Sequence, residues 1–246
     1  MKVTFLGTNG WFTTATGHTV STLIETKTEY LILDAGSAIA FADKFITKSK
    51  PIYLFLSHMH LDHTVGLHYL NKFDFKRGIK ILVYQKLLKP LKILMNAPYT
   101  LPPSKVKTKT SIIPSEKWGK LPLKIKAFKL SHSDDCYGLR FENEGKIISY
   151  AADTGLCPNI YKLAKNADLL ISECSYRSNE RRPHWPHLNP QDASSVAKKS
   201  KAKKLALIHF DPRRYTTFKS RQTALKFAKK IFKNTIVPKD LQQIEV

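Results

Sequence analysis

The stretch His58-Met59-His60-Leu61-Asp62-His63 is the most informative part of this sequence. It places four good metal ligands within six positions, directly after the apolar run Ile52–Leu56, which is typical of a buried strand. Because side chains alternate along an extended segment, His58, His60 and Asp62 would point to one side, whereas His63 suits a second, adjacent metal better. Imidazole and carboxylate are ligands that zinc accepts, and a catalytic site keeps one position open for water.

The alternative interpretation of this stretch is a histidine-rich surface loop. Thr64-Val65-Gly66-Leu67 follows it without the composition of a loop and predicts the start of a helix, with Thr64 as the polar cap. A strand, a ligand-rich turn and a helix in succession favour the metal site.

The length and composition indicate a folded, water-soluble protein. With 246 residues, 42% of them hydrophobic, the chain can form one domain, residues 1–246, with a well-filled core. No window approaches the apolar length that crosses a membrane, and Met1–Gly7 is typical of a first strand and not of a secretory signal. Cys136, Cys157 and Cys174 are isolated, as reduced thiols are. We therefore expect a cytoplasmic protein with no membrane partner; the sequence leaves its oligomeric state open, with a homodimer as one alternative.

The charge is strongly positive, with 41 Lys and Arg residues against 19 Asp and Glu residues and a formal net charge of +22. Such an excess attracts polyanions, and contact with phosphate is a common use of a basic surface. The lysines are spread along the whole chain, so a solvated basic surface explains the charge about as well. The segment Lys86–Lys109, with Tyr84 and Tyr99 nearby, is one candidate RNA-binding surface; its alternative, which we favour, is a solvated amphipathic helix.

Short apolar runs alternate with helical patterns along the chain. Strands are expected at Val3–Leu6, Val20–Glu25, Tyr30–Leu33, Ile52–Leu56, Ile79–Val83, Leu123–Leu130, Tyr137–Phe141, Lys146–Tyr150, Leu169–Ile171 and Leu205–Ile208. Helices are expected at Thr64–Asn71, Lys86–Met95, Ile160–Asn166, Pro190–Lys199 (capped by Asn189) and Phe218–Phe232, and a hairpin turn at Glu142–Gly145. This order indicates an α/β fold of two packed, mixed β-sheets with helices on both outer faces, an αββα arrangement.

Two neighbouring metals need about six to eight protein donors, so the first cluster requires partners downstream. His132, Asp153 and His209 each follow a predicted strand closely, where an α/β scaffold places its chemistry. A single histidine after a strand is usually structural, and an aspartate before Thr-Gly is usually part of a turn. Together with the first cluster, however, the three residues favour a metal site.

These motifs together resemble the metallo-β-lactamase fold superfamily over essentially the whole chain. The motifs that carry the resemblance are Ser57–His63, Leu130-Ser131-His132, Ala152-Asp153-Thr154, His209 and the early turn Leu33-Asp34-Ala35-Gly36. The resemblance implies a metallo-β-lactamase-like domain in which His58, His60 and His132 bind one metal and Asp62, His63 and His209 bind the other. It also implies that Asp153 bridges the two metals and that Asp34 steadies the ligand loop from behind. The metals would be two divalent ions, with zinc favoured and manganese or iron as alternatives.

Within the superfamily the chain is most similar to the ribonuclease Z branch. Three stretches carry this similarity: Ile171–Tyr176 with Glu173, Pro186–Asn189 with His187, and the ending His209-Phe210-Asp211-Pro212-Arg213-Arg214-Tyr215. It implies that Glu173 and His187 form a catalytic proton relay beside the scissile phosphate. The chain departs from the long-armed members, which insert a transfer-RNA-gripping arm between the equivalents of His132 and Asp153. Here this interval has room only for a strand, a turn and a strand.

The residues imply a dinuclear, metal-dependent hydrolase that cleaves a phosphodiester, either RNA or a nucleotide, with a metal-activated hydroxide held at the site that includes Asp62. Arg213 or Arg214 would neutralise the phosphate, and His187, oriented by Glu173, would protonate the leaving oxygen. The alternatives on the same fold are a small-molecule cyclic phosphodiesterase and a thioesterase or other ester hydrolase. A non-enzymatic nucleic-acid-binding module is a further alternative, against which the complete set of metal donors argues.

Overall fold

The computed structural model describes residues 1–246, which form two β-sheets packed face to face. The first sheet has seven strands in the order β13-β1-β2-β3-β4-β5-β6. Their bounds are β1 Lys2–Gly7, β2 Ser21–Glu25, β3 Tyr30–Leu33, β4 Ile52–Leu56, β5 Ile79–Val83, β6 Thr110–Pro114 and β13 Gln242–Glu245. The strands from β3 to β6 are parallel, whereas β1 pairs antiparallel with β2 and with β13.

The second sheet has six strands in the order β12-β11-β10-β9-β8-β7. Their bounds are β7 Lys124–Lys129, β8 Tyr137–Asn143, β9 Lys146–Ala151, β10 Leu169–Glu173, β11 Leu205–Ile208 and β12 Thr235–Ile236. The strands from β9 to β12 are parallel and β7 to β9 form an antiparallel meander. β7 is therefore an edge strand of this sheet.

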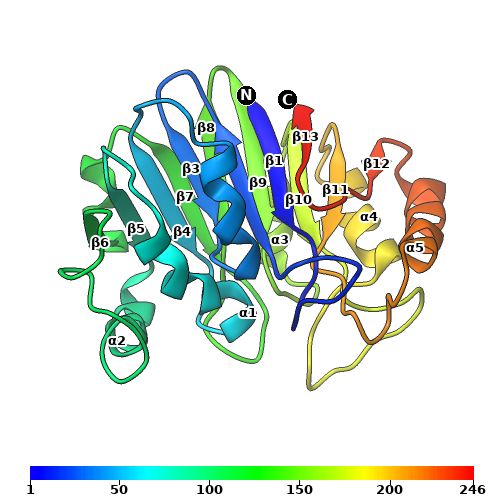
Figure 1. Cartoon of the computed structure of the whole chain (residues 1–246). Helices are drawn as coiled ribbons and strands as arrows, with labels where there is room; N and C mark the ends of the chain where they lie inside the picture. The colour runs from blue at the N-terminus through cyan, green and yellow to red at the C-terminus, as the bar shows by residue number, and fades with distance from the viewer.

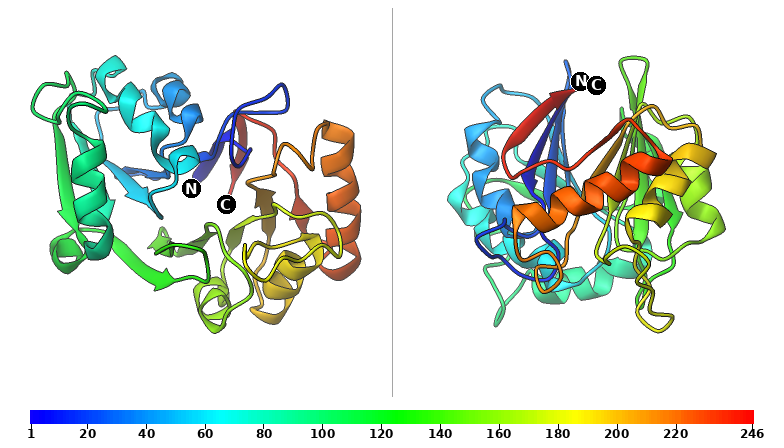
Figure 2. Two further views of the ribbon diagram at one scale, coloured as in Figure 1. Left: turned by 90° about the horizontal axis from the view of Figure 1, so that it is seen from below. Right: turned by 90° about the vertical axis from the view of Figure 1, so that its right-hand side faces the viewer.

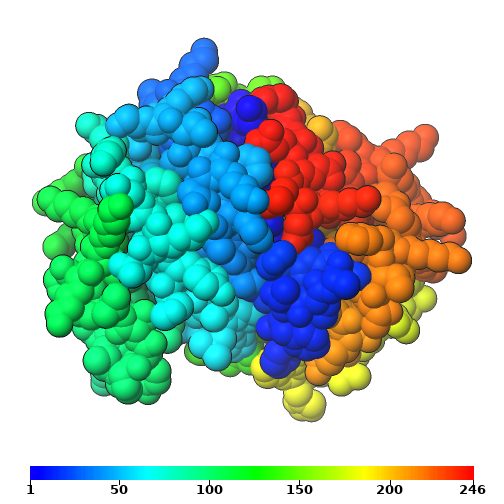
Figure 3. Space-filling view, viewed as in Figure 1, coloured from blue at the N-terminus to red at the C-terminus, as the bar shows by residue number.

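Helices cover both outer faces, so the four layers follow the αββα order (Figure 1 and Figure 2). On the side of the first sheet lie α1 Leu61–Thr64, α2 Leu88–Leu94 and the 3₁₀ helices η1 Ser37–Lys44, η2 Val65–Lys72, η3 Gln85–Leu87 and η4 Ser115–Lys120. The second sheet carries α3 Pro158–Ala164, α4 Pro190–Lys199 and α5 Phe218–Ile231. The two termini lie side by side (Figure 3), and the Met1 amino group is 3.3 Å from the Val246 carbonyl oxygen. No helix is long and apolar enough to span a membrane.

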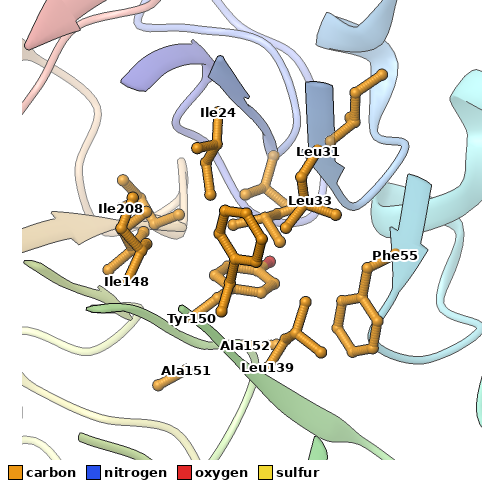
Figure 4. Packing of buried hydrophobic residues seen from close by; sticks show 14 of the residues in the cluster. Ile24, Leu31, Leu33, Phe55, Leu139, Ile148, Tyr150, Ala151, Ala152 and Ile208 are labelled. Atoms are coloured by element: carbon orange, nitrogen blue, oxygen red, sulfur yellow. The ribbon is translucent and has the colours of Figure 1, made fainter. Parts of the chain in front are cut away.

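The core lies between the two sheets, where side chains of Leu33 and Phe55 on the first face Leu139, Ile148 and Tyr150 on the second (Figure 4). The central parallel strands β3, β4, β10 and β11 are buried along their whole length. Strands buried on both faces are read in sequence as continuous apolar runs, and these are the runs that predicted them. By contrast, β7 alternates between exposed and half-buried side chains.

The predicted fold class is confirmed, and four of the predicted strands, β3, β4, β5 and β11, match residue for residue. The helix Pro190–Lys199 is also confirmed with its cap, because the Asn189 side chain accepts a hydrogen bond from the Asp192 amide. The hairpin turn predicted at Glu142–Gly145 is confirmed only at Glu144 and Gly145, which have the positive φ angles of a two-residue turn, whereas Glu142 and Asn143 belong to β8. Strands β6, β12 and β13 were not predicted, since they are short or polar and owe their pairing to distant neighbours.

The helix predicted to begin at Thr64 is wrong in its start. It begins at Leu61 instead, and Thr64 is the last residue of α1, with its hydroxyl donating to the His60 carbonyl oxygen at 2.9 Å. The chain turns from α1 directly into the 3₁₀ helix η2. The predicted helix Lys86–Met95 is likewise divided into η3 and α2, and Ile160–Asn166 is shifted two residues toward the N-terminus.

Candidate metal centre

The predicted donors come together at the edge where strands of both sheets end, close to α1 in Figure 1. His58 follows β4 by two residues, Asp153 follows β9 by two, and His209 follows β11 directly. His132 lies three residues beyond β7. Because parallel strands end at the same edge of a sheet, residues far apart in the sequence meet here.

The ligand stretch is extended only as far as His60. His60 has extended backbone angles, and α1 begins at the next residue, so Asp62 and His63 lie on a helical turn. The alternation that would place His58, His60 and Asp62 on one side therefore ends at His60, and Asp62 points instead toward His209, with Oδ2 3.1 Å from its Nε2. This change of backbone conformation sorts the donors into two groups.

The two groups are those that the family resemblance implied. One contains His58, His60 and His132, and the other contains Asp62, His63 and His209; His187 also lies near Asp153 and His209, as part of a third possible donor set. Asp153 lies between the groups: its Oδ1 is 3.3 Å from His63 Nε2 and 3.1 Å from His209 Nε2, and its Oδ2 is 4.0 Å from His58 Nε2 and 3.9 Å from His132 Nε2. A carboxylate with one oxygen toward each group has the geometry of a bridging ligand.

The chemistry of this cluster fits bound cations. His58 Nε2 and His132 Nδ1 are buried and have no hydrogen-bond partner, and Asp153 Oδ1 is buried with only imidazole nitrogens of the cluster near it. A buried polar atom left unpaired costs about 1–3 kcal/mol, so such atoms gathered in one place require a common explanation. Imidazole nitrogens and carboxylate oxygens within 4.8 Å of one another are donors for a transition-metal ion. The cluster is therefore able to bind metals.

Hydrogen bonds from outside the cluster orient the imidazole rings. The Ser57 hydroxyl lies 2.9 Å from His58 Nδ1, and the Ser175 hydroxyl lies 2.9 Å from His209 Nδ1. In both rings the bonded nitrogen is Nδ1, which leaves Nε2 directed at the cluster. Such outer contacts fix the tautomer and orientation of a metal-binding histidine.

Asp34 is the most heavily used of these outer groups and is fully buried. Its Oδ1 accepts from the Ser57 amide at 2.7 Å. Its Oδ2 accepts from the Ser57 hydroxyl at 2.7 Å, from His63 Nδ1 at 2.7 Å and from the Tyr150 hydroxyl at 2.6 Å. Burial, together with the Asp34 carboxylate, raises the pKa of Tyr150 well above its usual value, so the phenol remains a donor.

Glu173 and His187 form a buried pair beside the cluster. The Glu173 Oε1 accepts from His187 Nδ1 at 2.7 Å and from the Thr154 amide at 2.7 Å, and its Oε2 accepts from the Ser175 amide at 3.2 Å. His187 Nδ1 is 4.0 Å from Asp153 Oδ2. Burial lowers the pKa of His187, but the charges of Glu173, Asp153 and Asp62 outweigh it and raise this pKa to about 9.

A cavity of about 370 Å³ opens onto the cluster. Its lining includes His60, Asp62, Asp153, His187 and His209, together with Trp11, Leu61 and Trp185. A second cavity of about 240 Å³ adjoins it, since it shares Trp11, Trp185 and His187 and also includes Arg182, Arg213 and Arg214. The two tryptophans therefore line both the cavity over the metal donors and the one beside it.

Neither tryptophan was predicted from the sequence to belong to the site. The rings of Trp11 and Trp185 stack with centroids 5.9 Å apart, and Trp185 is in turn nearly parallel to His60 at 6.1 Å. The Trp11 amide donates to Asp62 Oδ2 at 2.7 Å from a residue with φ 58°. Asn9-Gly10 before Trp11 is a turn signal that could have marked this loop, whereas nothing around Trp185 distinguishes it from other loop residues.

The two predicted arginines lie beside the second cavity, and both already pair with carboxylates. Arg214 binds Glu180 with Nη2–Oε1 at 2.6 Å and also contacts Asp211, and it is largely buried. Arg213 binds Asp211 with Nη2–Oδ2 at 3.0 Å but is 56% exposed, and its guanidinium lies 4.9 Å from the centre of the Trp11 ring. Arg213 is thus the more accessible of the two to a ligand.

A family model described as "Beta-lactamase superfamily domain" matches residues 32–210, which is most of the chain. The chain belongs to the beta-lactamase superfamily. The matched segment includes all the donors described above, and the fold and the His/Asp cluster are those of a metallo-hydrolase of this superfamily.

Individual superfamily members agree with this assignment. A probable metallo-hydrolase, YhfI of Bacillus subtilis, is 27% identical over 85% of this chain and 86% of its own length. The ribonuclease Z of Pyrococcus abyssi is 25% identical over 100% of this chain and 96% of its own. Two crystal structures share the fold: YhfI, with a TM-score of 0.82, 24% identity and 99% coverage of both chains, and the short form of human tRNase Z, with 0.76, 23%, and coverage of 100% and 99%.

The first prediction concerns Gly10, which lies against His209. A Cβ at Gly10 would be 2.5 Å from His209 Cε1 and 2.8 Å from both ring nitrogens. We expect Gly10→Ala to push the ring aside and to reduce the bound metal measured by elemental analysis by about half or more. Gly119→Ala is the matched control, because nothing lies within 4 Å of its Cβ position. Equal metal content in both variants would contradict the prediction.

The second prediction concerns the Asp34 contacts. Asp34→Asn keeps the size of the side chain but removes the charge that orients His63, and we expect metal affinity to fall about 10–100-fold. Tyr150→Phe removes only one of the bonds to Asp34 and should lower affinity less. Titration with a chelating dye measures both. The prediction fails if the two variants rank in the opposite order.

Proposed function

We propose that this metallo-hydrolase is a phosphodiesterase of the ribonuclease Z-like type that holds two divalent cations, zinc by preference. One ion would be bound by His58, His60 and His132, the other by Asp62, His63 and His209, and Asp153 would bridge them. The grouping and the unpaired buried atoms of the donors support this assignment. The names of the related ribonuclease Z proteins, whose alignments cover the whole of this chain, support the type of activity.

The observation that carries the proposal is the Glu173–His187 pair. A phosphodiester with an alcohol leaving group needs a proton on the departing oxygen, whereas a thioester releases a thiolate, which leaves readily without a separate proton donor. His187 is fixed by its Nδ1 to Glu173 at 2.7 Å and lines the cavity over the cluster, so Nε2 is free to donate there. Glu173 is in turn held by two backbone amides, which keeps the pair rigid.

When bound, two divalent ions supply Lewis acidity for the phosphate oxygens and lower the pKa of a water molecule toward neutrality. The side chains of the protein would transfer the proton and bind the rest of the substrate. His187 gives its proton to the leaving oxygen and takes up another from solvent afterwards, while Glu173 stabilises the imidazolium. Arg213, next to the Trp11 ring at the rim, offers its exposed guanidinium edge to the non-reacting part of an anionic substrate. Arg214 holds the loop that carries Trp185 through Glu180.

A small cyclic phosphodiester is the second candidate substrate, and the short β8–β9 hairpin favours it. Between His132 and Asp153 the chain forms only this hairpin, closed at Glu144-Gly145. A long transfer-RNA-gripping arm would have to emerge from this interval. The small-substrate alternative therefore concerns what is cleaved, and leaves the proposed chemistry unchanged.

The third prediction tests the metals. Wild-type protein purified without chelator should contain two ions per chain by elemental analysis, and Asp62→Ala should lose at least one of them together with hydrolysis of bis-p-nitrophenyl phosphate. Asp43→Ala, at an exposed carboxylate paired with Lys72, is the control and should retain both. One ion at saturation in the wild-type protein would disprove the dinuclear site.

The fourth prediction separates a proton donor from a ligand. His187→Ala should keep its metal and lose about a hundredfold in turnover on a diester with an alkyl leaving group. With p-nitrophenolate, which leaves without a proton, the loss should be much smaller. His184→Ala, an exposed histidine of the same loop, is the matched control. Equal losses on both substrates, or loss of metal, would remove the proton-donor role.

A further inference from the structure

A basic groove lies on the outer face of the second sheet, away from the metal donors. It has a volume of about 640 Å³ and runs between the edge strand β7 with its neighbour β8 and the C-terminal end of α3. We define this basic groove by the residues that line it: Lys124, Ile125, Lys126, Phe128, Arg140, Glu142, Lys162, Lys165 and Asn166. None of them contributes to the metal centre.

The charge of the groove is almost uncompensated. Its four lysines, Lys124, Lys126, Lys162 and Lys165, are exposed, and none forms an ion pair. The single carboxylate, Glu142, is already bound to Arg140, whose Nε donates to it at 2.9 Å. Other lysines of this chain, such as Lys50, Lys129 and Lys203, have acidic partners within 4 Å. Four unpaired lysines around one hollow repel each other and attract a polyanion.

The spacing of the side chains suits an extended strand of nucleic acid. Lys124, Lys126 and Phe128 alternate with inward-facing residues, so they stand on one face of β7 about 6.6 Å apart. Phe128 is half-buried, and the Lys126 ammonium lies 5.3 Å from the centre of its ring. Cations that follow a backbone, combined with an aromatic ring that a base can stack on, are the elements of single-strand binding sites.

The groove is joined to the metal centre by the chain itself. Phe128 precedes the donor His132 by four residues, which limits their Cα separation to about 14 Å, and Lys124 lies within about 28 Å. The start of α3 fixes the end of this strand, because the Asn159 side chain donates to the Lys129 carbonyl oxygen at 2.9 Å. A strand of several nucleotides can therefore occupy the groove while its scissile bond lies at the metals.

The segment Lys86–Lys109, which the sequence singled out, has these properties to a smaller degree. Lys86 lies 3.9 Å from Asp135 and Lys107 lies 3.0 Å from Asp74. Tyr84 is stacked on Tyr137 with ring centroids 3.9 Å apart. Four lysines of the segment, Lys89, Lys92, Lys105 and Lys109, are exposed and unpaired as well, so what distinguishes the basic groove is that its four unpaired lysines line one hollow.

From these observations we propose that the basic groove binds a single-stranded segment of the RNA substrate and guides it to the metal centre. The inference rests on the proposed phosphodiesterase function, whose substrate class it narrows to RNA longer than a dinucleotide. Each phosphate bound in the groove makes binding dependent on salt, and a substrate too short to reach it gains nothing from it.

The test compares two doubly substituted proteins of equal charge. Lys126→Glu with Lys162→Glu alters the groove, whereas Lys226→Glu with Lys229→Glu makes the same change on exposed positions of α5. Fluorescence anisotropy would measure binding of labelled oligouridine RNA of about four and about twelve nucleotides at two salt concentrations. Hydrolysis of bis-p-nitrophenyl phosphate would be followed in parallel as the groove-independent reaction.

We expect the groove variant to bind the longer RNA at least tenfold more weakly than the wild-type protein. Its salt slope should be shallower by about 0.7 for each phosphate that the groove no longer neutralises. The α5 variant should bind the longer RNA nearly as the wild-type protein does, and both variants should hydrolyse the small diester at the wild-type rate. The milder pair Lys126→Gln with Lys162→Gln should weaken binding in the same direction, which guards against misfolding of the charge-reversed protein.

Equal losses of affinity in the groove and α5 variants would overturn the proposal, because the effect would then belong to the total charge. The groove would instead be a membrane-binding surface if its variant no longer bound phosphatidylserine vesicles and still bound RNA, and this too would overturn it. If neither the wild-type protein nor the variants hydrolyse bis-p-nitrophenyl phosphate, the proposed phosphodiesterase function fails. The RNA-binding measurement still decides independently whether the groove holds a nucleic-acid strand.

Discussion

The metal centre depends on the buried Asp34 carboxylate more than on any other group outside the cluster. It ties Ser57, at the start of the ligand stretch, to His63, at its end, and to Tyr150 from the opposite sheet. Removing one partner of a buried charge leaves it uncompensated, at a cost of about 3–5 kcal/mol. The same hydrogen bonds that make the interior tolerate this charge also hold the loop in the shape that brings the donors together. The hydrogen bonds of Asp34 therefore determine both how the two sheets are held together and how the donors are arranged.

Much of this arrangement could be predicted from local patterns in the sequence. His58, Asp153 and His209 each follow a strand whose apolar run is unmistakable, so their meeting at one edge could be predicted from strand order alone. The division of the donors into two groups required more, because it depends on the chain turning into α1 at Leu61. Periodicity gave no sign of that turn, and only the resemblance to a known superfamily placed Asp62 with His63 and His209, the residues near which it lies in the structure.

The interactions that the sequence did not predict are those between loops that come from opposite sheets. Trp11 and Trp185 come from segments of opposite sheets, and their stacking depends on where both loops end in space. In the sequence Gly10 resembles an ordinary turn residue, and only the structure shows that it lies against the His209 ring. In the same way, the meaning of a lysine depends on whether an acid lies within reach, and composition cannot distinguish Lys129, which is paired, from Lys126, which is not.

The second sheet carries part of the donor cluster and, under our proposal, the groove that leads to it. Asp153 and His209 follow β9 and β11, and Glu173 is the last residue of β10. At this edge of the sheet Asp153 contacts His209, and Glu173 accepts a hydrogen bond from the amide of Thr154. β7, at the other side of the same sheet, leads from the basic groove to His132. If an RNA strand binds along β7 as we propose, the hydrogen bonds of the sheet would position it relative to the donors at the ends of β9 and β11. In that case the short β8–β9 hairpin would not exclude an RNA substrate, since a groove on the body of the protein needs no projecting arm.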